Sequence, residues 1–182
     1  VAGTGGPLDF GPRTVAGTYY AVGTNPLTGC SSIMVGTVDV TLDPLPNDYS
    51  IVGGGAFCAG GAGVDLTLPW SDFGIEYQLY RGGTAVGSPF PGVDDALDFG
   101  FQTVGGVYTV RARNTVTGCT KNMPGSAVVT VISNTVYMVT GGGSFCAGGT
   151  GVSVGVSNSQ SGVNYQLLRD GTAVGSVVAG TG

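Results

Sequence analysis

The chain has 182 residues, of which 36 are glycine, and it carries a net charge of −5 with one lysine and no histidine. Six scattered Lys and Arg residues do not make the clustered basic surface that nucleic-acid binding needs, so we expect no nucleic-acid partner. No apolar run reaches the roughly 20 residues that span a bilayer, so we expect no membrane insertion. Abundant Val, Thr, Tyr and Gly favour strands joined by turns.

A glycine-rich motif that contains one cysteine, called the glycine phrase below, occurs twice and defines an internal repeat. Residues 53–61 return at 141–149 with one change, at an offset of 88 (141 − 53). The phrase Leu-Asp-Phe-Gly at 8–11 returns at 97–100, at an offset of 89 (97 − 8). We therefore divide the chain into three predicted parts, each holding a half or the whole of an Ig-like repeat. They are the first segment (1–44, a C-terminal half), the middle repeat (45–132, complete) and the third segment (133–182, an N-terminal half).

The last five residues, 178–182, have the same sequence as the first five, 1–5. When they are superposed, the third segment continues into the first segment in register, which gives a two-repeat period of 177 residues (88 + 89). We expect the chain to be one segment of a longer polymer with this period. Each half-repeat then needs its complement, from covalent continuation or from strand donation by a neighbour, and we expect covalent continuation.

The middle repeat is predicted to contain seven short strands and no helix. A Pro-containing linker at 43–46 comes first, and a turn signal at 81–84 predicts a hairpin. Seven strands in about 90 residues predict an all-β fold of tandem immunoglobulin-like sandwiches, with about seven strands in each domain. The predicted strands are 49–52, 64–68, 75–81, 85–87, 96–102, 107–113 and a long last strand from about 119 to 131.

Three motifs of the middle repeat, at 57–61, 107–110 and 118–120, resemble the Ig-like or PKD-like repeats of giant secreted surface proteins of Bacteroidetes. Such proteins include gliding-motility adhesins and cell-surface fibres exported by the type IX route. The resemblance implies a secreted, extracellular or cell-surface location. It implies a module that serves as stalk, spacer or adhesive tip, and does not choose among these roles.

Four cysteines, Cys30, Cys58, Cys119 and Cys146, recur with the repeat and fit an oxidising compartment. Cys58 and Cys119 are 61 residues apart, as are Cys146 and Cys30 of the next period (30 + 177 − 146). One disulfide within each domain is one interpretation. The other is a staple between domains, from Cys58 to the next-period Cys30 and from Cys119 to the preceding Cys146.

The predicted topology favours the staple. In an up-down sandwich the turns that carry Cys58 and Cys119 lie at opposite ends, about 20 Å apart for a strand of six residues. A disulfide needs Cα atoms within about 7 Å. One miscounted strand would reverse this argument, so both pairings stay open.

Few residues are candidates for a ligand site. Trp70 and Phe90 lie in predicted loops and are the candidate contacts for a glycan or protein, although for Trp70 we favour packing over an edge. The acidic residues Asp94, Asp95 and Asp98 favour a solvated turn over a calcium loop, because the acidic pair does not recur in the other repeat.

The chain lacks histidine, and its one glutamate, Glu76, does not recur in the third segment. We therefore expect no enzyme, no catalytic or metal-binding residue and no cofactor. The preferred function is an extracellular filament or adhesin shaft whose partners are neighbouring copies, arranged head to tail and packed laterally. The alternative is an adhesin module that binds a surface glycan or protein.

Overall fold

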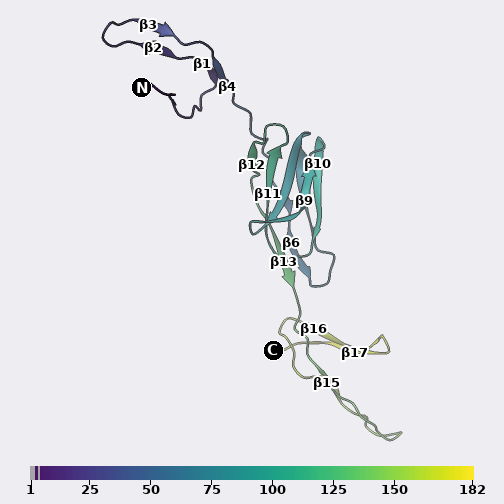
Figure 1. The fold of residues 1–182 in the computed structure, drawn as a ribbon. Coiled ribbons are helices and arrows are strands. Elements are labelled where there is room, and N and C mark those ends of the chain that lie inside the picture. Colours follow the sequence, from purple (N-terminus) through teal and green to yellow (C-terminus); the bar gives the residue numbers. More distant parts are fainter. Residues whose placement is uncertain (1–2, 4) are drawn as a thin grey trace. The chain divides into compact units, whose positions relative to one another are not determined.

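A computed structural model describes residue 3 and residues 5–182 of the chain (Figure 1). The described residues form seventeen strands. The all-β prediction is therefore confirmed. The search of these residues found no helix of the length and apolarity that a bilayer crossing requires.

The strands are distributed over the three predicted parts of the chain. The first segment holds β1 (Gly17–Tyr19), β2 (Val22–Thr24), β3 (Ser31–Ile33) and β4 (Val38–Val40). The middle repeat holds β5 (Val52–Gly53), β6 (Gly55–Cys58), β7 (Val64–Ser71), β8 (Ile75–Arg81), β9 (Thr84–Pro91), β10 (Asp95–Gln102), β11 (Gly106–Asn114), β12 (Thr120–Asn122) and β13 (Ala127–Ile132). The third segment holds β14 (Val139–Gly141), β15 (Val154–Val156), β16 (Asn164–Arg169) and β17 (Thr172–Ala179).

The chain divides into two compact units that interleave in sequence. One contains the residues up to Gly53 together with 65–100 and 107–127, and the other contains 54–64, 101–106 and 128–182. In the first unit β1 pairs with β4, β2 with β3, β5 with β7, and β8 with both β9 and β11, all antiparallel. In the second unit β6 and β13 are parallel, while β14–β15 and β16–β17 are antiparallel.

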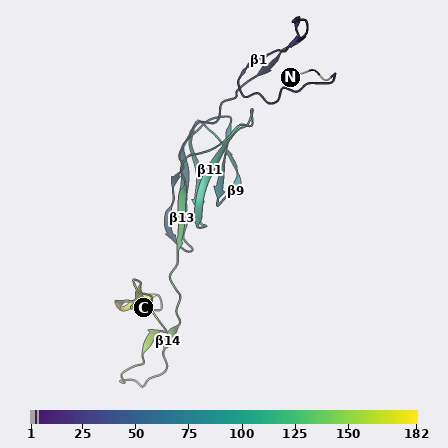
Figure 2. The same ribbon diagram turned by 90° about the vertical axis from the view of Figure 1, so that its left-hand side faces the viewer.

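The middle repeat has a sandwich-like architecture. A three-stranded sheet has the order β10-β7-β5. In the other sheet of the first unit, β8 lies between β9 and β11, and β12 pairs with β11. Figure 2 shows the same ribbon turned by 90°, with β9 and β11 labelled. Burial alternates along β11, where Tyr108, Val110 and Ala112 are buried and the residues between them are exposed. The buried apolar residues of the first unit are Ile51, Leu66, Leu68, Ile75, Tyr77, Leu79, Leu97, Phe99, Tyr108, Val110, Ala112, Met123 and Ala127.

Most predicted strands of the middle repeat are confirmed, and two predictions are wrong. Strand β8 has the predicted bounds, while β7, β9, β10 and β11 contain the predicted ranges 64–68, 85–87, 96–102 and 107–113. The predicted strand 49–52 is wrong except at Val52, because no strand includes Tyr49, Ser50 or Ile51 and the Tyr49 hydroxyl bonds to Asp72 instead.

The long last strand is also wrong. It is broken into β12 and β13 at Pro124 and Gly125, where proline lacks a donor and Gly125 has φ 79°. This interruption, with another in the first strand, gives the middle repeat nine strands where seven were predicted.

The glycine phrase is the point where the first strand passes from one sheet to the other. Strand β5 pairs with β7, whereas β6 pairs with β13. Gly53, Gly54 and Gly55 have φ of 107°, 91° and 129°, a region that side chains disfavour. A Cβ on Gly53 would clash with the carbonyl oxygen of Asp65. We call residues 53–55 the sheet switch.

The sheet switch predicts a large effect of one methyl group. Gly53→Ala places a side chain at positive φ and against the β7 backbone, so we expect the free energy of unfolding to fall by about 2 kcal/mol or more. Urea unfolding followed by the fluorescence of Trp70, the single tryptophan, measures this change. The control is Gly82→Ala, which has φ 53° and open space around it, and for which about 1 kcal/mol is expected. Equal losses in the two variants would show that the close contact has no effect.

Candidate functional site: the linker anchor and the cysteine turns

The residues directly after the predicted linker, 47–49, are fastened to the rest of the middle repeat by side-chain contacts. The carboxylate of Asp72, between β7 and β8, accepts hydrogen bonds from the Tyr49 hydroxyl at 2.7 Å and the Asn47 amide at 2.9 Å. The Lys121 ammonium on β12 lies 2.7 Å from the carboxylate of Asp48. We call Asn47, Asp48, Tyr49, Asp72 and Lys121 the linker anchor. Because these contacts reach three successive residues directly after the linker, they restrict the path by which the linker enters the domain.

The anchor's central hydrogen bond changes the titration of Tyr49. The hydrogen bond to Asp72 is the largest cause, followed by burial and by the negative charge of Asp72, and together they raise the pKa of Tyr49 to about 12. The phenol therefore remains a hydrogen-bond donor throughout the neutral range. The backbone N–H of Asp72 donates in turn to the Tyr77 hydroxyl at 3.0 Å, which ties the anchor to a buried core residue.

The anchor position recurs in the third segment with different chemistry. Gln160 occupies the position of Asp72 (160 − 72 = 88). Its side-chain oxygen accepts a hydrogen bond from the backbone N–H of Thr135 at 2.9 Å, and its backbone N–H donates to the Tyr165 hydroxyl at 2.8 Å. The same loop position thus holds the corresponding residue, Asn47 or Thr135, in both repeats. Tyr49 also recurs, as Tyr137 (137 − 49 = 88), and this recurrence was the sequence signal that could have identified the anchor.

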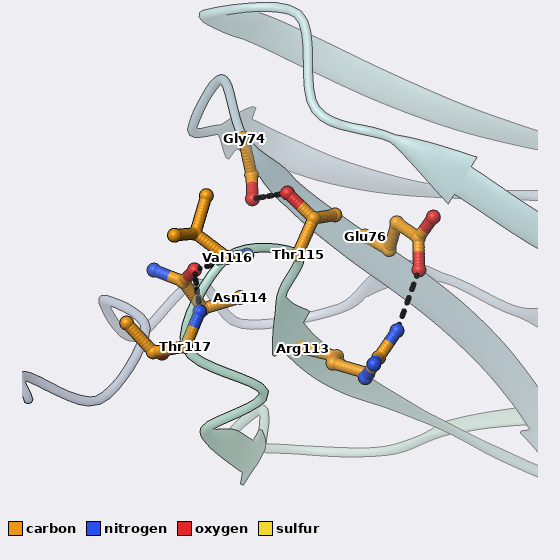
Figure 3. Close-up of polar contacts among 7 residues, drawn as sticks. All are labelled: Gly74, Glu76, Arg113, Asn114, Thr115, Val116 and Thr117. Carbon is orange, nitrogen blue, oxygen red and sulfur yellow. Dashed lines mark hydrogen bonds and ion pairs between the residues drawn. The ribbon is translucent and has the colours of Figure 1, made fainter.

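The turn that precedes Cys119 is docked on the loop before β8 (Figure 3). The Asn114 side-chain oxygen accepts hydrogen bonds from the N–H groups of Val116 and Thr117, at 2.9 and 3.0 Å. Thr115 donates to the carbonyl of Gly74 from its N–H at 3.0 Å and from its hydroxyl at 2.8 Å. The turn is therefore fixed both internally and against a neighbouring loop.

An ion pair beside this turn, between Arg113 and Glu76 at 3.5 Å, is also drawn in Figure 3. Both side chains are about half exposed, so the pair contributes little to stability.

The same turn surrounds Cys30. The Asn25 side-chain oxygen accepts from the N–H groups of Leu27 and Thr28, and the Asn25 N–H donates to the Cys30 carbonyl at 2.9 Å. The corresponding bond from Asn114 to Cys119 is also 2.9 Å. The two cysteines of this class therefore have one local backbone geometry in two repeats.

The other two cysteines share a different turn. The N–H of Gly61 donates to the Cys58 carbonyl at 2.9 Å, and the N–H of Gly149 donates to the Cys146 carbonyl at the same distance. Positive φ at the preceding glycine, 83° at Gly60, fits a type II turn.

All four cysteines are free thiols in the structure. Three of them, Cys30, Cys58 and Cys146, are exposed, and Cys119 is half-buried. Both predicted pairings, the staple between domains and the disulfide within a domain, stay predictions.

The two predicted ligand-contact residues lie in different environments. Both belong to strands, so the prediction that they lie in loops is wrong. Trp70 is on β7 with 41% of its surface exposed. Phe90 is on β9, and its ring meets the buried ring of Phe99 edge to face, with centroids 5.2 Å apart. Strands β7 and β9 belong to different sheets, so the structure does not bring the two residues together on one sheet.

The acidic residues near β10 bind backbone groups. Asp94 accepts a hydrogen bond from the N–H of Phe73, and Asp98 accepts one from the N–H of Gly100. In the part of the chain that the structure describes, no three His, Cys, Asp or Glu side chains gather in a group that could hold a metal ion.

One feature near these acids was not predicted. One oxygen of the Asp65 carboxyl is buried without a hydrogen-bond partner. Burial, followed by the hydrogen bond and charge of Asp98, raises the pKa of Asp65.

Comparisons with protein-family models, with curated proteins and with solved structures returned no match.

The linker anchor predicts a stability change that depends on pH. Because the folded-state pKa of Tyr49 is raised above 10, its contribution is fully present below pH 10 and is lost as the pH rises toward 12. We expect Tyr49→Phe to lower the free energy of unfolding by about 0.5–1 kcal/mol at neutral pH, because the bond is partly exposed to solvent. The difference from the native chain should vanish between pH 10 and 12.

Urea unfolding at several pH values measures both effects. Tyr20→Phe is the control, because Tyr20 is exposed and should be replaced without loss. A Tyr49→Phe difference that stays constant up to pH 12 would contradict the role of the Tyr49–Asp72 hydrogen bond.

Proposed function

We propose that this chain is a structural repeat region of an extracellular filament or adhesin shaft, built from tandem Ig-like domains. The observation that carries the proposal is that side-chain hydrogen bonds recur at the repeat offset, beyond the recurrence of sequence. A domain that acts as one bead of a shaft needs the same local structure in each copy, and it needs a controlled connection to the next bead.

A glutamine shows the recurrence most clearly. The Gln78 amide donates to the carbonyls of Leu79 and Val86, at 2.9 and 3.0 Å, where the pairing of β8 and β9 shifts register. Gln166 (166 − 78 = 88) makes the same contacts with Leu167 and Val174, at 3.0 and 3.1 Å, at the corresponding irregularity of β16 and β17. Both glutamines fill an interruption in a hairpin, so the interruption belongs to the repeating plan.

A tyrosine in the first segment supports the Ig-like part of the proposal. The Tyr19 hydroxyl donates to the carbonyl of Val15, four residues upstream, at 2.8 Å. A tyrosine that bonds to the backbone a few residues before it is a hallmark of Ig-like sandwiches. Tyr108 (108 − 19 = 89) holds the same position in the middle repeat and is buried there.

The linker anchor suits a shaft. Contacts from Asp72 and Lys121 hold the residues directly after the predicted linker, and Pro46 in this linker is buried. A linker held by its own domain limits the angles available between consecutive domains, which a stiff shaft requires. Secretion to the cell surface, the resemblance to Bacteroidetes surface fibres and the association with neighbouring copies are parts of the same proposal.

Both classes of turn carry exposed cysteines, so disulfides between domains can form at these positions. In native material we expect Cys58 to be joined to Cys30 of the next period. Proteolysis without reduction, followed by mass spectrometry, would identify the linked peptides. A peptide that joins Cys58 to Cys119 within one repeat would contradict the staple and support the disulfide within a domain.

Electron microscopy of native material tests the proposed function itself. We expect a beaded filament with a structural period of two domains, since two repeats make the 177-residue period. The intact mass of the subunit is the accompanying measurement. Discrete particles built from a subunit near 18 kDa, the mass of these 182 residues, would contradict a shaft made of a long repeat array.

A further inference from the structure

The first and third segments expose residues that are core residues in the middle repeat. Phe10 is 54% exposed, while Phe99 at the equivalent position (99 − 10 = 89) is 6% exposed. Leu167 is 47% exposed, while Leu79 (167 − 79 = 88) is 1% exposed. The further pairs, each with the exposed residue first, are Leu8 and Leu97, Met34 and Met123, Val38 and Ala127, Val154 and Leu66, and Val156 and Leu68.

The exposed sets of the two segments are complementary halves of one core. In the middle repeat, β7 and β8 supply Leu66, Leu68, Tyr77 and Leu79. The third segment carries the counterparts of these residues, and the first segment carries the counterparts of the core residues from β10 onward. Each segment therefore has the apolar face that the other one lacks, and neither exposes a set that duplicates the other.

The first segment also has an open apolar groove that could receive the apolar face of the third segment. Its volume is about 780 Å³. The groove is lined mainly by apolar side chains, among them Leu8, Phe10, Tyr19, Met34, Val38 and Val40. All six correspond to buried residues of the middle repeat, at positions 97, 99, 108, 123, 127 and 129. In the middle repeat, the residues equivalent to the groove lining are covered by the N-terminal strands of that repeat. The groove of the first segment therefore marks the place that such strands would fill.

We propose that the third segment of one copy docks in this groove on the first segment of a second copy, and that together they complete a sandwich of the middle-repeat type. This inference rests on the repeat architecture of the proposed function. The middle repeat supplies the register, because β8 pairs with β11 with Leu79 opposite Val110 and Tyr77 opposite Ala112. At the repeat offsets, β16 pairs with β1 and β2 of the second copy, with Leu167 opposite Ala21 and Tyr165 opposite Gly23.

The partner is a second copy because of the direction of the strands in the middle repeat. Strands β6 and β13 are parallel, with Gly55 opposite Val129 and Cys58 opposite Ile132. The chain therefore enters β6 at one end of this pair and leaves β13 at the other end. For one chain to close its own two segments on each other, its linkers would have to return along the pair, whereas a second copy needs no such return. The same contact would form between consecutive parts of a continuous polymer.

Sedimentation of the full 182-residue chain under reducing conditions tests the proposal without a contribution from disulfides. We expect the average mass to rise with concentration over roughly a hundredfold range. Phe10→Asp in the groove and Leu167→Asp on the docking face should each weaken association tenfold or more. Mixing these two variants should restore association and stop it at dimers, because each supplies the one surface that the other still needs.

The control is Leu27→Asp, since Leu27 is 94% exposed and its counterpart Val116 is 89% exposed, so neither belongs to a core. This variant should associate like the native chain. Trp70 fluorescence in the middle repeat should show unchanged unfolding in all three variants. A native chain that stays monomeric, or variants that associate like it, would overturn the docking. Such a result would leave the shaft proposal standing, because images of native material test it independently.

A charge pair tests the register. In the middle repeat Arg113 lies opposite Glu76, and the counterparts in the docked pair are Thr24 and Asn164. In mixtures of the Phe10→Asp and Leu167→Asp variants, Asn164→Glu is added to the former, and Thr24→Arg or Thr24→Glu to the latter. The arginine mixture should bind about threefold or more tightly than the glutamate mixture. Equal affinities would overturn the proposed strand pairing.

Discussion

The fold of the middle repeat depends on a backbone constraint at the sheet switch. Three consecutive glycines with positive φ let one short strand pair with β7 and then, after one residue, with β13. The carbonyl of Asp65 lies where a side chain on Gly53 would be, so the close approach of the two backbones requires glycine. A side chain on Gly141 would meet the carbonyl of Ser153 equally closely, which shows that the constraint is a property of the repeat.

This constraint gives the glycine-rich composition a structural reason. The many glycines are concentrated at turns, at the sheet switch and at hairpin irregularities, and their positions recur along with the hydrogen bonds of Gln78 and Gln166. Polar side chains, by contrast, each fasten one linker or one turn. The anchor aspartate holds a linker, and the asparagines before Cys30 and Cys119 close turns. The recurring fold of the repeat is therefore determined by backbone geometry more than by charge.

Periodicity was sufficient to predict the strands whose side chains alternate. Strand β8 was located to the residue because Ile75, Tyr77 and Leu79 mark its buried face. The break at Pro124 was missed although the pair Pro124-Gly125 is itself a turn signal. The sheet switch was missed because it depends on which neighbour a backbone segment meets, and composition does not record this. The linker anchor was missed for a similar reason. Asp72 and Tyr49 are 23 residues apart in sequence, and only folding brings their oxygens within 2.7 Å.

The parallel pairing of β6 and β13 has a mechanical consequence. The two strands run in the same direction over four residue pairs, from Gly55 with Val129 to Cys58 with Ile132. Tension applied to the chain before β6 and after β13 pulls these strands past each other. The ladder is then loaded in shear, with its hydrogen bonds sharing the force, whereas a hairpin pulled from its open end breaks one bond at a time. Resistance to stretching is thus set by the pairing of β6 with β13.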